Sequence, residues 1–160
     1  MSVQNICQVV PAGVVCFFSS YDYLEIFYKY LMKTKDILNK IENKKIIFKE
    51  PRGGGGHALD KLLLEYNLVI KSNKCKGALL LSVIGGKLSE GINFSDDLGR
   101  CIIVVGLPYP NKNNPELIEK MAYLNKNINQ GENKQANFGQ QYYENLCMKA
   151  VNQCIGLYLH

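Results

Sequence analysis

Two continuous apolar runs, separated by a long polar connection, most constrain the fold of this chain. The first run extends from Ala78 to Ile84 and the second from Cys101 to Leu107. Neither run alternates apolar and polar residues, so each suits a strand that is covered on both faces of a sheet. The connection, Gly85 to Arg100, is long enough for a parallel crossover, which needs about a dozen residues or more. We therefore expect two neighbouring, covered, parallel strands, with a polar loop at the edge where ligands of open α/β sheets bind.

The rest of the chain alternates strand and helix patterns. A buried strand is predicted at Gly13–Phe18, and Ser19 or Ser20 can then cap a helix over Tyr21–Met32. The later expected elements are a helix end or solvated connector at Lys33–Lys44, a strand at Lys45–Lys49, a helix at Ala58–Lys71, a helix from Pro115, a polar loop insert at 125–137 and a helix at Tyr142–Ile155 with Leu146, Met148 or Ala150, and Val151 inward. This order predicts a single α/β domain over residues 1–160, with a mostly parallel sheet and helices on both faces.

Composition limits the classes of function. The chain has 160 residues, a net charge of +5 and 47% hydrophobic residues, which is ordinary for a globular domain and permits an anionic partner. Its six cysteines include no C-x-x-C pair and its two histidines are isolated, so we expect no zinc or iron–sulfur site within it. No secretory signal is visible and no apolar run reaches the roughly 20 residues of a membrane helix. We expect no membrane association and a reducing, intracellular compartment.

Two glycine-rich stretches invite a phosphate-binding interpretation. The tract at 53–56 is followed by His57 and Ala58 rather than by the Lys and hydroxyl residue of a Walker A loop. A second near match at Gly86 and Lys87 has Leu88 where a magnesium-binding Ser or Thr would stand. The tract at 53–56 is thus read as a flexible loop, and the chain lacks a Walker A element.

The loop from Gly85 to Phe94 is the strongest local signal of a ligand site. Its glycines allow close approach of the backbone, Lys87 can neutralise phosphate, and Glu90 and Asn93 can accept hydrogen bonds from a sugar or position water. A plain turn with solvated charges is the alternative. The residue types alone leave these two interpretations open.

Four ordered blocks resemble one family: Val9–Tyr21, Phe48–Pro51, Gly77–Asn111 and Glu144–Gly156. The third block is similar to motif V of the XPD-like superfamily-two DNA helicases, the group that carries an iron–sulfur domain. More narrowly, the chain resembles the Chl-type cohesion helicases. The resemblance implies a three-layer, RecA-like (P-loop NTPase-like) C-terminal motor domain that follows the Walker-bearing and iron–sulfur domains.

The resemblance also implies functional residues and partners. The residues implied to contact single-stranded or forked DNA are Ser19, Ser20, Tyr21, Lys87 and Ser89. The residues implied to face a nucleotide held between two motor domains are Glu90, Gly91, Asn93, Gln153 and Gly156. ATP and Mg²⁺ would be shared with the first motor domain, and the iron–sulfur cluster would lie outside this chain. The family works in DNA repair and sister chromatid cohesion, which implies a nuclear location. For Ser19 and Ser20, helix capping is the competing interpretation.

The chain departs from the family pattern at motif VI. Leu157 and His160 stand where the family has two arginines. A neutral leucine cannot stabilise phosphate charge, and histidine is mostly neutral at pH 7. We expect a lobe that is inactive alone and whose sheet lacks its last strand, so whether the chain is itself an enzyme stays open. The alternative is a non-catalytic protein-interaction fragment or pseudo-helicase lobe. A small α/β hydrolase ranks last because no histidine lies near a G-x-S-x-G element.

Overall fold

Four parallel strands form the centre of the computed structural model, which describes residues 3–53, 55–72, 76–86, 88, 94, 96–128 and 137–156. The strands are β1 (Gly13–Phe18), β2 (Lys45–Lys49), β3 (Gly77–Val83) and β4 (Cys101–Val105). Their order is β2-β3-β1-β4, and every neighbouring pair is parallel. The mostly parallel sheet expected from the apolar runs is therefore confirmed.

The two apolar runs are parallel but are not neighbours, which corrects one expectation. β1 lies between β3 and β4, pairing Gly13 with Ala78 on one side and Val14 with Cys101 on the other. Every residue of β1 is buried, whereas all five residues of β4 are only half-buried. The fully buried strand β1 thus takes a central place, and β4 is not covered as fully as its composition suggested.

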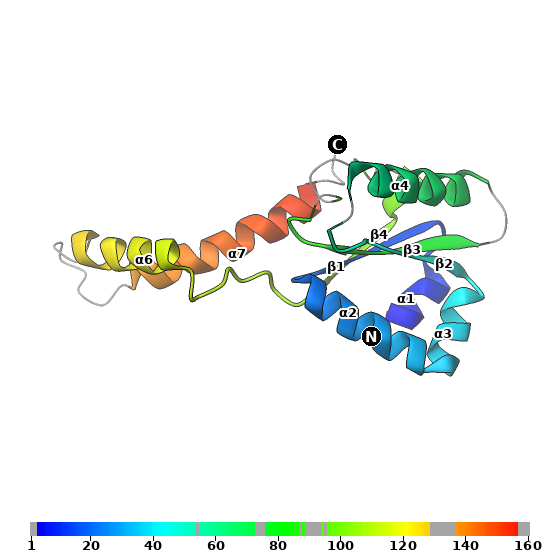
Figure 1. The fold of residues 1–160 in the computed structure, drawn as a ribbon, viewed down its shortest axis with the longest axis horizontal. Coiled ribbons are helices and arrows are strands. Elements are labelled where there is room, and N and C mark those ends of the chain that lie inside the picture. The colour runs from blue at the N-terminus through cyan, green and yellow to red at the C-terminus, as the bar shows by residue number, and fades with distance from the viewer. Residues whose placement is uncertain are drawn as a thin grey trace.

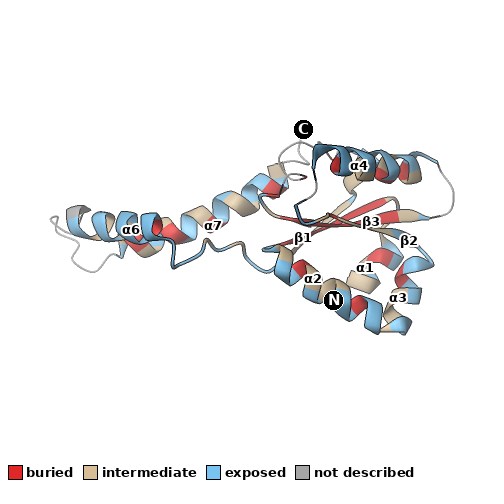
Figure 2. Cartoon of the chain, viewed as in Figure 1, coloured by how far each residue is buried: buried red, intermediate tan, exposed pale blue. Residues whose placement is uncertain are grey.

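Helices cover both faces of the sheet (Figure 1). One face carries α4 (Gly56–Lys71), and the other carries α1 (Val3–Val9), α2 (Tyr21–Lys33) and α3 (Lys35–Glu42). Alternate residues of β1 point to the two sides: Cys16 packs with the α1–α3 side and Phe17 with the α4 side. Figure 2 shows buried residues concentrated on the strands and on the helix faces toward them. The three-layer α/β architecture is the one predicted.

Two helices were not predicted. α1 occupies residues that carried no helix prediction, and α3 occupies most of the segment Lys33–Lys44 that was interpreted as a helix end or connector. Ile37, Leu38 and Ile41 lie at helical spacing, and Ile41 is completely buried against the α2 side of the sheet. The surrounding lysines and asparagines concealed this short apolar face.

An arm of two helices extends away from the sheet (Figure 1). It consists of α6 (Pro115–Ile128) and α7 (Phe138–Gly156), which run in opposite directions and pack along each other. α6 includes the first four residues of the predicted polar insert, so the boundary at residue 125 was wrong, and residues 129–136 lie outside the described residues. Met148, one of two alternatives for an inward position, is 50% exposed.

No helix in the described part of the chain is both long and apolar enough to cross a membrane.

Candidate functional site

The segments that follow the four strands meet at one edge of the sheet because all four strands point the same way. Ser19 follows β1, Glu50 follows β2, Ile84 follows β3 and Gly106 follows β4. The Ile84 amide donates to the carbonyl of Phe18 over 2.9 Å, which ties the ends of β3 and β1 together. The Cβ position of Gly106 is 3.8 Å from the Ser19 hydroxyl oxygen. This carboxyl edge is where the sequence placed the ligand contacts.

The two serines after β1 have different roles. Ser20 is the N-cap of α2, and its hydroxyl oxygen accepts a hydrogen bond from the Tyr23 amide over 3.1 Å. Ser19 is exposed at the carboxyl edge, next to Gly106. Gly106 has a φ of +77°, a conformation that favours glycine, so the chain can turn closely past Ser19. The capping interpretation therefore holds for Ser20, and Ser19 is free of that role.

A buried carboxylate joins three of these segments. Glu50 is 1% exposed and accepts hydrogen bonds from the Tyr21 hydroxyl (2.7 Å), the Ser82 hydroxyl (2.7 Å) and the Val83 amide (3.0 Å). Burial, followed by the bond to Glu50, raises the pKa of Tyr21 to about 12. Because a buried carboxylate is costly unless its oxygens are satisfied, the three donors explain how Glu50 is tolerated there. Glu50 therefore fixes the start of α2 against the ends of β2 and β3.

Sequence reasoning missed this role of Glu50. The residue was noticed only as part of the block Phe48–Pro51, because a single glutamate after a strand resembles an ordinary solvated charge. The available signal was its position between a predicted strand and Pro51, at the same edge as Ser19 and Tyr21. Tyr21, in contrast, was singled out by the family resemblance and does lie at this edge.

One exposed and one part-buried ion pair connect α2 with the end of β2. Arg52 Nη1 lies 2.6 Å from Asp22 Oδ1, and Lys49 Nζ lies 2.6 Å from Glu25 Oε1. Lys49 Nζ also lies 4.6 Å from the centre of the Tyr28 ring. The bond to Lys49 lowers the pKa of Glu25. Because solvent screens such pairs, each contributes little to the free energy of folding. Their main effect is on the position of α2 at this edge.

The predicted loop residues Lys87, Ser89, Glu90, Gly91 and Asn93 lie outside the described residues, so their roles stay predictions. Two apolar residues of the same loop are described. Leu88 and Phe94 are each 1% exposed and pack on the α4 side of the sheet, where the Phe94 ring lies edge-on to Tyr66. The loop is thus attached to the core at two points around its polar residues.

The family model described as the helicase C-terminal domain matches residues 3–157. The chain belongs to the helicase C-terminal domain family. It is 49% identical to the ATP-dependent DNA helicase DDX11 of Danio rerio over 161 residues, an alignment covering 96% of this chain and 17% of that protein. It is also 49% identical to DDX11 of Mus musculus (95% of this chain, 17% of that protein) and 47% identical to CHL1 of Scheffersomyces stipitis (97% and 18%). The resemblance to Chl-type, XPD-like helicases is confirmed.

The helicase C-terminal domain described here thus spans less than a fifth of the length of these curated relatives. Two of the residues that the resemblance implies to face nucleotide lie near the end of α7, within the described residues. Gln153 is exposed and Gly156 is half-buried, and between them Cys154 packs on the α4 side of the sheet. The end of α7 is therefore docked on the sheet, and within the described part of the chain no hydrogen bond or ion pair joins Gln153 to Ser19 or Tyr21.

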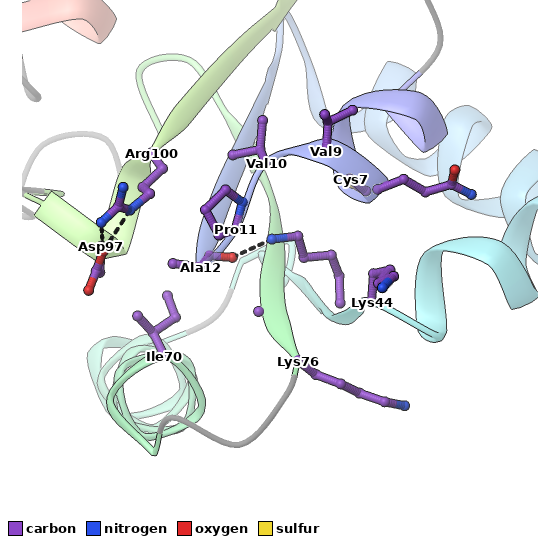
Figure 3. A pocket seen from close by; sticks show the side chains of 13 residues that line it. Cys7, Val9, Val10, Pro11, Ala12, Lys44, Ile70, Lys76, Asp97 and Arg100 are labelled. Atoms are coloured by element: carbon purple, nitrogen blue, oxygen red, sulfur yellow. Dashed lines mark hydrogen bonds and ion pairs between the residues drawn. The ribbon is translucent and has the colours of Figure 1, made fainter.

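A cavity of about 510 Å³ lies at the opposite edge of the sheet in this helicase domain (Figure 3). Two of its cationic groups are already engaged: Lys45 Nζ donates to the carbonyl of Ala12 over 2.6 Å, and Arg100 pairs with Asp97 at 2.6 Å. Burial lowers the pKa of Lys45. The cavity lies at the amino ends of the strands, away from Ser19 and Tyr21, so the carboxyl edge is the better candidate site.

Proposed function

We propose that this helicase C-terminal domain is the second motor lobe of an ATP-dependent DNA helicase. In this role it supplies contacts to single-stranded DNA and one side of an ATP cleft. The observation that carries the proposal is the meeting of the segments after β1 and β3 at one edge, with Ser19 exposed there. Family membership supports the same role, because the similar proteins are named ATP-dependent DNA helicases.

The residues proposed to contact DNA are Ser19, Tyr21, Lys87 and Ser89. Ser20 is proposed to support them by its position at the start of α2. Hydroxyls, backbone N–H groups and lysines are common contacts to nucleic-acid phosphates, and such contacts position a strand without reading its sequence. Ser20 holds the start of α2 through its bond to the Tyr23 amide. Its contribution to DNA binding would therefore be through the position of α2 rather than through a free hydroxyl.

The residues proposed to face the nucleotide are Glu90, Gly91, Asn93, Gln153 and Gly156. Phosphoryl transfer needs positive charge at the developing negative charge, and an arginine finger commonly supplies it. Leu157 and His160 replace the two arginines of the family pattern, so we expect no hydrolysis by the isolated chain. Among the described residues, no group of three or more His, Cys, Asp or Glu side chains is placed to hold a metal. Mg²⁺ and the triphosphate would be held chiefly by the first motor domain.

The setting of the proposed helicase follows from the same resemblance. The first motor domain of the same protein would be the partner, and the iron–sulfur cluster would belong to a domain outside this chain. We propose action on single-stranded or forked DNA in the nucleus, in DNA repair and sister chromatid cohesion.

Fluorescence anisotropy with a labelled single-stranded oligonucleotide tests the DNA-contacting part of this function. We expect weak binding by the 160-residue chain at about 50 mM salt and much weaker binding at about 200 mM, because released counterions drive such binding. Ser19→Asp should weaken binding by placing negative charge at the exposed edge, while Ser72→Asp, on the exposed end of α4, serves as the matched control. Absence of binding at about 50 mM salt would contradict the proposal.

A second candidate function, protein interaction without catalysis, is favoured by exposed apolar side chains on the arm and on the segment that leads to it from β4. Leu107, Ile118 and Tyr123 are 53%, 52% and 65% exposed. Size-exclusion chromatography with candidate protein partners, before and after nuclease treatment, discriminates the two functions. A complex that survives nuclease, together with failure to bind oligonucleotide, would favour this second function.

A further inference from the structure

Tyr109 is held flat against the arm just beyond the end of β4. It stands between Pro108 and Pro110, which restrict the backbone, and its amide donates to the carbonyl of Leu107 over 2.9 Å. Its ring stacks on the ring of Tyr143 from α7, with 5.2 Å between the ring centres and 14° between the ring planes. Tyr109 is nevertheless 49% exposed. One part of its ring is thus supported by the arm while much of the side chain remains open to solvent.

The ring that supports Tyr109 is itself anchored. Tyr143 is 3% exposed, and its hydroxyl donates to the carbonyl of Pro110 over 2.9 Å. Lys112 Nζ lies 5.1 Å from the centre of the Tyr143 ring, so a positive charge stands beside the stacked pair. The ring that supports Tyr109 is therefore anchored by a hydrogen bond and lies close to a cation before any ligand binds.

Tyr109 lies close to the proposed DNA-contacting edge. Gly106 approaches the Ser19 hydroxyl, and Tyr109 is three residues further along the chain, so its Cα lies within roughly 11 Å of the Gly106 Cα. Figure 1 shows the segment after β4 leaving the sheet and running along the arm toward α6. A strand that contacts Ser19 could continue along this segment.

We infer that Tyr109 stacks on a base of single-stranded nucleic acid, with Lys112 near the adjoining phosphate. This inference rests on the proposed function and adds a base contact to it. Proteins that bind single strands without sequence preference combine aromatic stacking surfaces with cations that follow the backbone, and the ring of Tyr109 and the charge of Lys112 provide both. The exposed part of the Tyr109 ring is not covered by the core, and a stacked base would cover it.

Affinity measurements on substituted versions of the 160-residue chain test the inference. We expect Tyr109→Ala and Tyr109→Leu to weaken oligonucleotide binding by about 5- to 100-fold, and Tyr109→Phe to bind within about twofold of the unmodified chain. Tyr123→Ala removes a more exposed tyrosine of the same arm and should leave the affinity unchanged. The dependence of affinity on salt should stay the same in Tyr109→Leu, because no phosphate contact is lost, and should become shallower in Lys112→Ala.

A second measurement reports on base stacking directly and begins with the unmodified chain. An oligonucleotide containing 2-aminopurine should change its fluorescence when the unmodified chain binds, because stacking on Tyr109 alters the environment of the base, and Tyr109→Leu should reduce that change. If the unmodified chain binds while Tyr109→Leu retains both its affinity and the fluorescence change, the inference is wrong and the proposed function stands. If the unmodified chain binds no oligonucleotide, both fail together.

Discussion

The Tyr21 hydroxyl donates a hydrogen bond to the buried carboxylate of Glu50 over 2.7 Å, joining the first residue of α2 to the end of β2. The same carboxylate also accepts from Ser82 and Val83 at the end of β3. One side chain therefore holds together three segments of the carboxyl edge, which makes Glu50 the most informative position for mutagenesis of the fold.

Replacing Glu50 should destabilise the domain markedly. Glu50→Ala leaves the Ser82 hydroxyl and the Val83 amide without their buried acceptor, and we expect a loss of about 2–4 kcal/mol in the free energy of unfolding. Ser82→Ala removes only one donor and should cost about 1 kcal/mol. Urea denaturation measures both. Glu65→Ala, on the exposed face of α4, should change stability by less than about 0.5 kcal/mol. If Glu65→Ala lost as much stability as Glu50→Ala, the effect could not be assigned to the hydrogen bonds of Glu50.

Stability at high pH should depend on Tyr21. Its pKa is raised from 10.0 to about 12, so the folded protein keeps the phenol proton that the unfolded chain loses first. This contribution is fully present below pH 10 and declines as the pH rises from 10 toward 12. Tyr21→Phe has no proton to lose, so its stability should fall less steeply across that interval. Denaturation midpoints at pH 9, 10 and 11 give the comparison, and parallel curves for the two proteins would show that Tyr21 is not the group responsible.

Two glycines offer a matched pair for testing the packing of the sheet. A Cβ at Gly13 would overlap the backbone carbonyl of Leu98, whereas a Cβ at Gly56 meets nothing within 4 Å. Gly13→Ala should therefore cost about 3 kcal/mol or more, because a backbone group cannot move aside as a side chain can. Gly56→Ala, in the first turn of α4, should be neutral or stabilise by about 0.5 kcal/mol. Thermal unfolding of both variants would show the difference, and similar melting temperatures would mean that β1 and the segment near Leu98 are packed differently.

Thiol labelling should report burial on the α1–α3 side of the sheet. Burial raises the pKa of Cys7 to about 11 and that of Cys16 to about 12, so at pH 8 roughly one Cys7 thiol in a thousand or fewer is ionised. Both residues are also almost inaccessible. Iodoacetamide followed by peptide mass spectrometry should label Cys101, which is half-buried, well before either of them. Denaturation in urea should abolish the difference; rapid labelling of Cys16 in buffer would argue against its central position in β1.

The sequence predicted the strands and the longest core helix well because each carries an unambiguous pattern. Residues 45–49 form a strand as expected, and α4 covers the helix predicted at Ala58–Lys71 and buries Leu59, Tyr66 and Ile70. The order of the strands was not predicted correctly from the sequence. β1 lies next to both β3 and β4, and this depends on how the crossovers pack rather than on any local pattern. α1 and α3 were missed because their short apolar faces lie among polar residues.

The candidate site was predicted in part. The resemblance selected Ser19, Ser20 and Tyr21, and the structure places all three after β1 at the carboxyl edge. Sequence reasoning could not separate the capping hydroxyl of Ser20 from the free one of Ser19, because only geometry shows which one meets the Tyr23 amide. Tyr109 gave no signal, as a tyrosine between two prolines could equally have been buried.

Among the described residues, the arm of α6 and α7 joins the sheet through the segment after β4 and through the docked end of α7. With its 19 residues, α7 is roughly 28 Å long, so a rotation of about 10° at its base would swing the far end by about 5 Å. A slight rearrangement where α7 meets the strands would therefore become a displacement nearly as large as one helical turn at the tip of the arm.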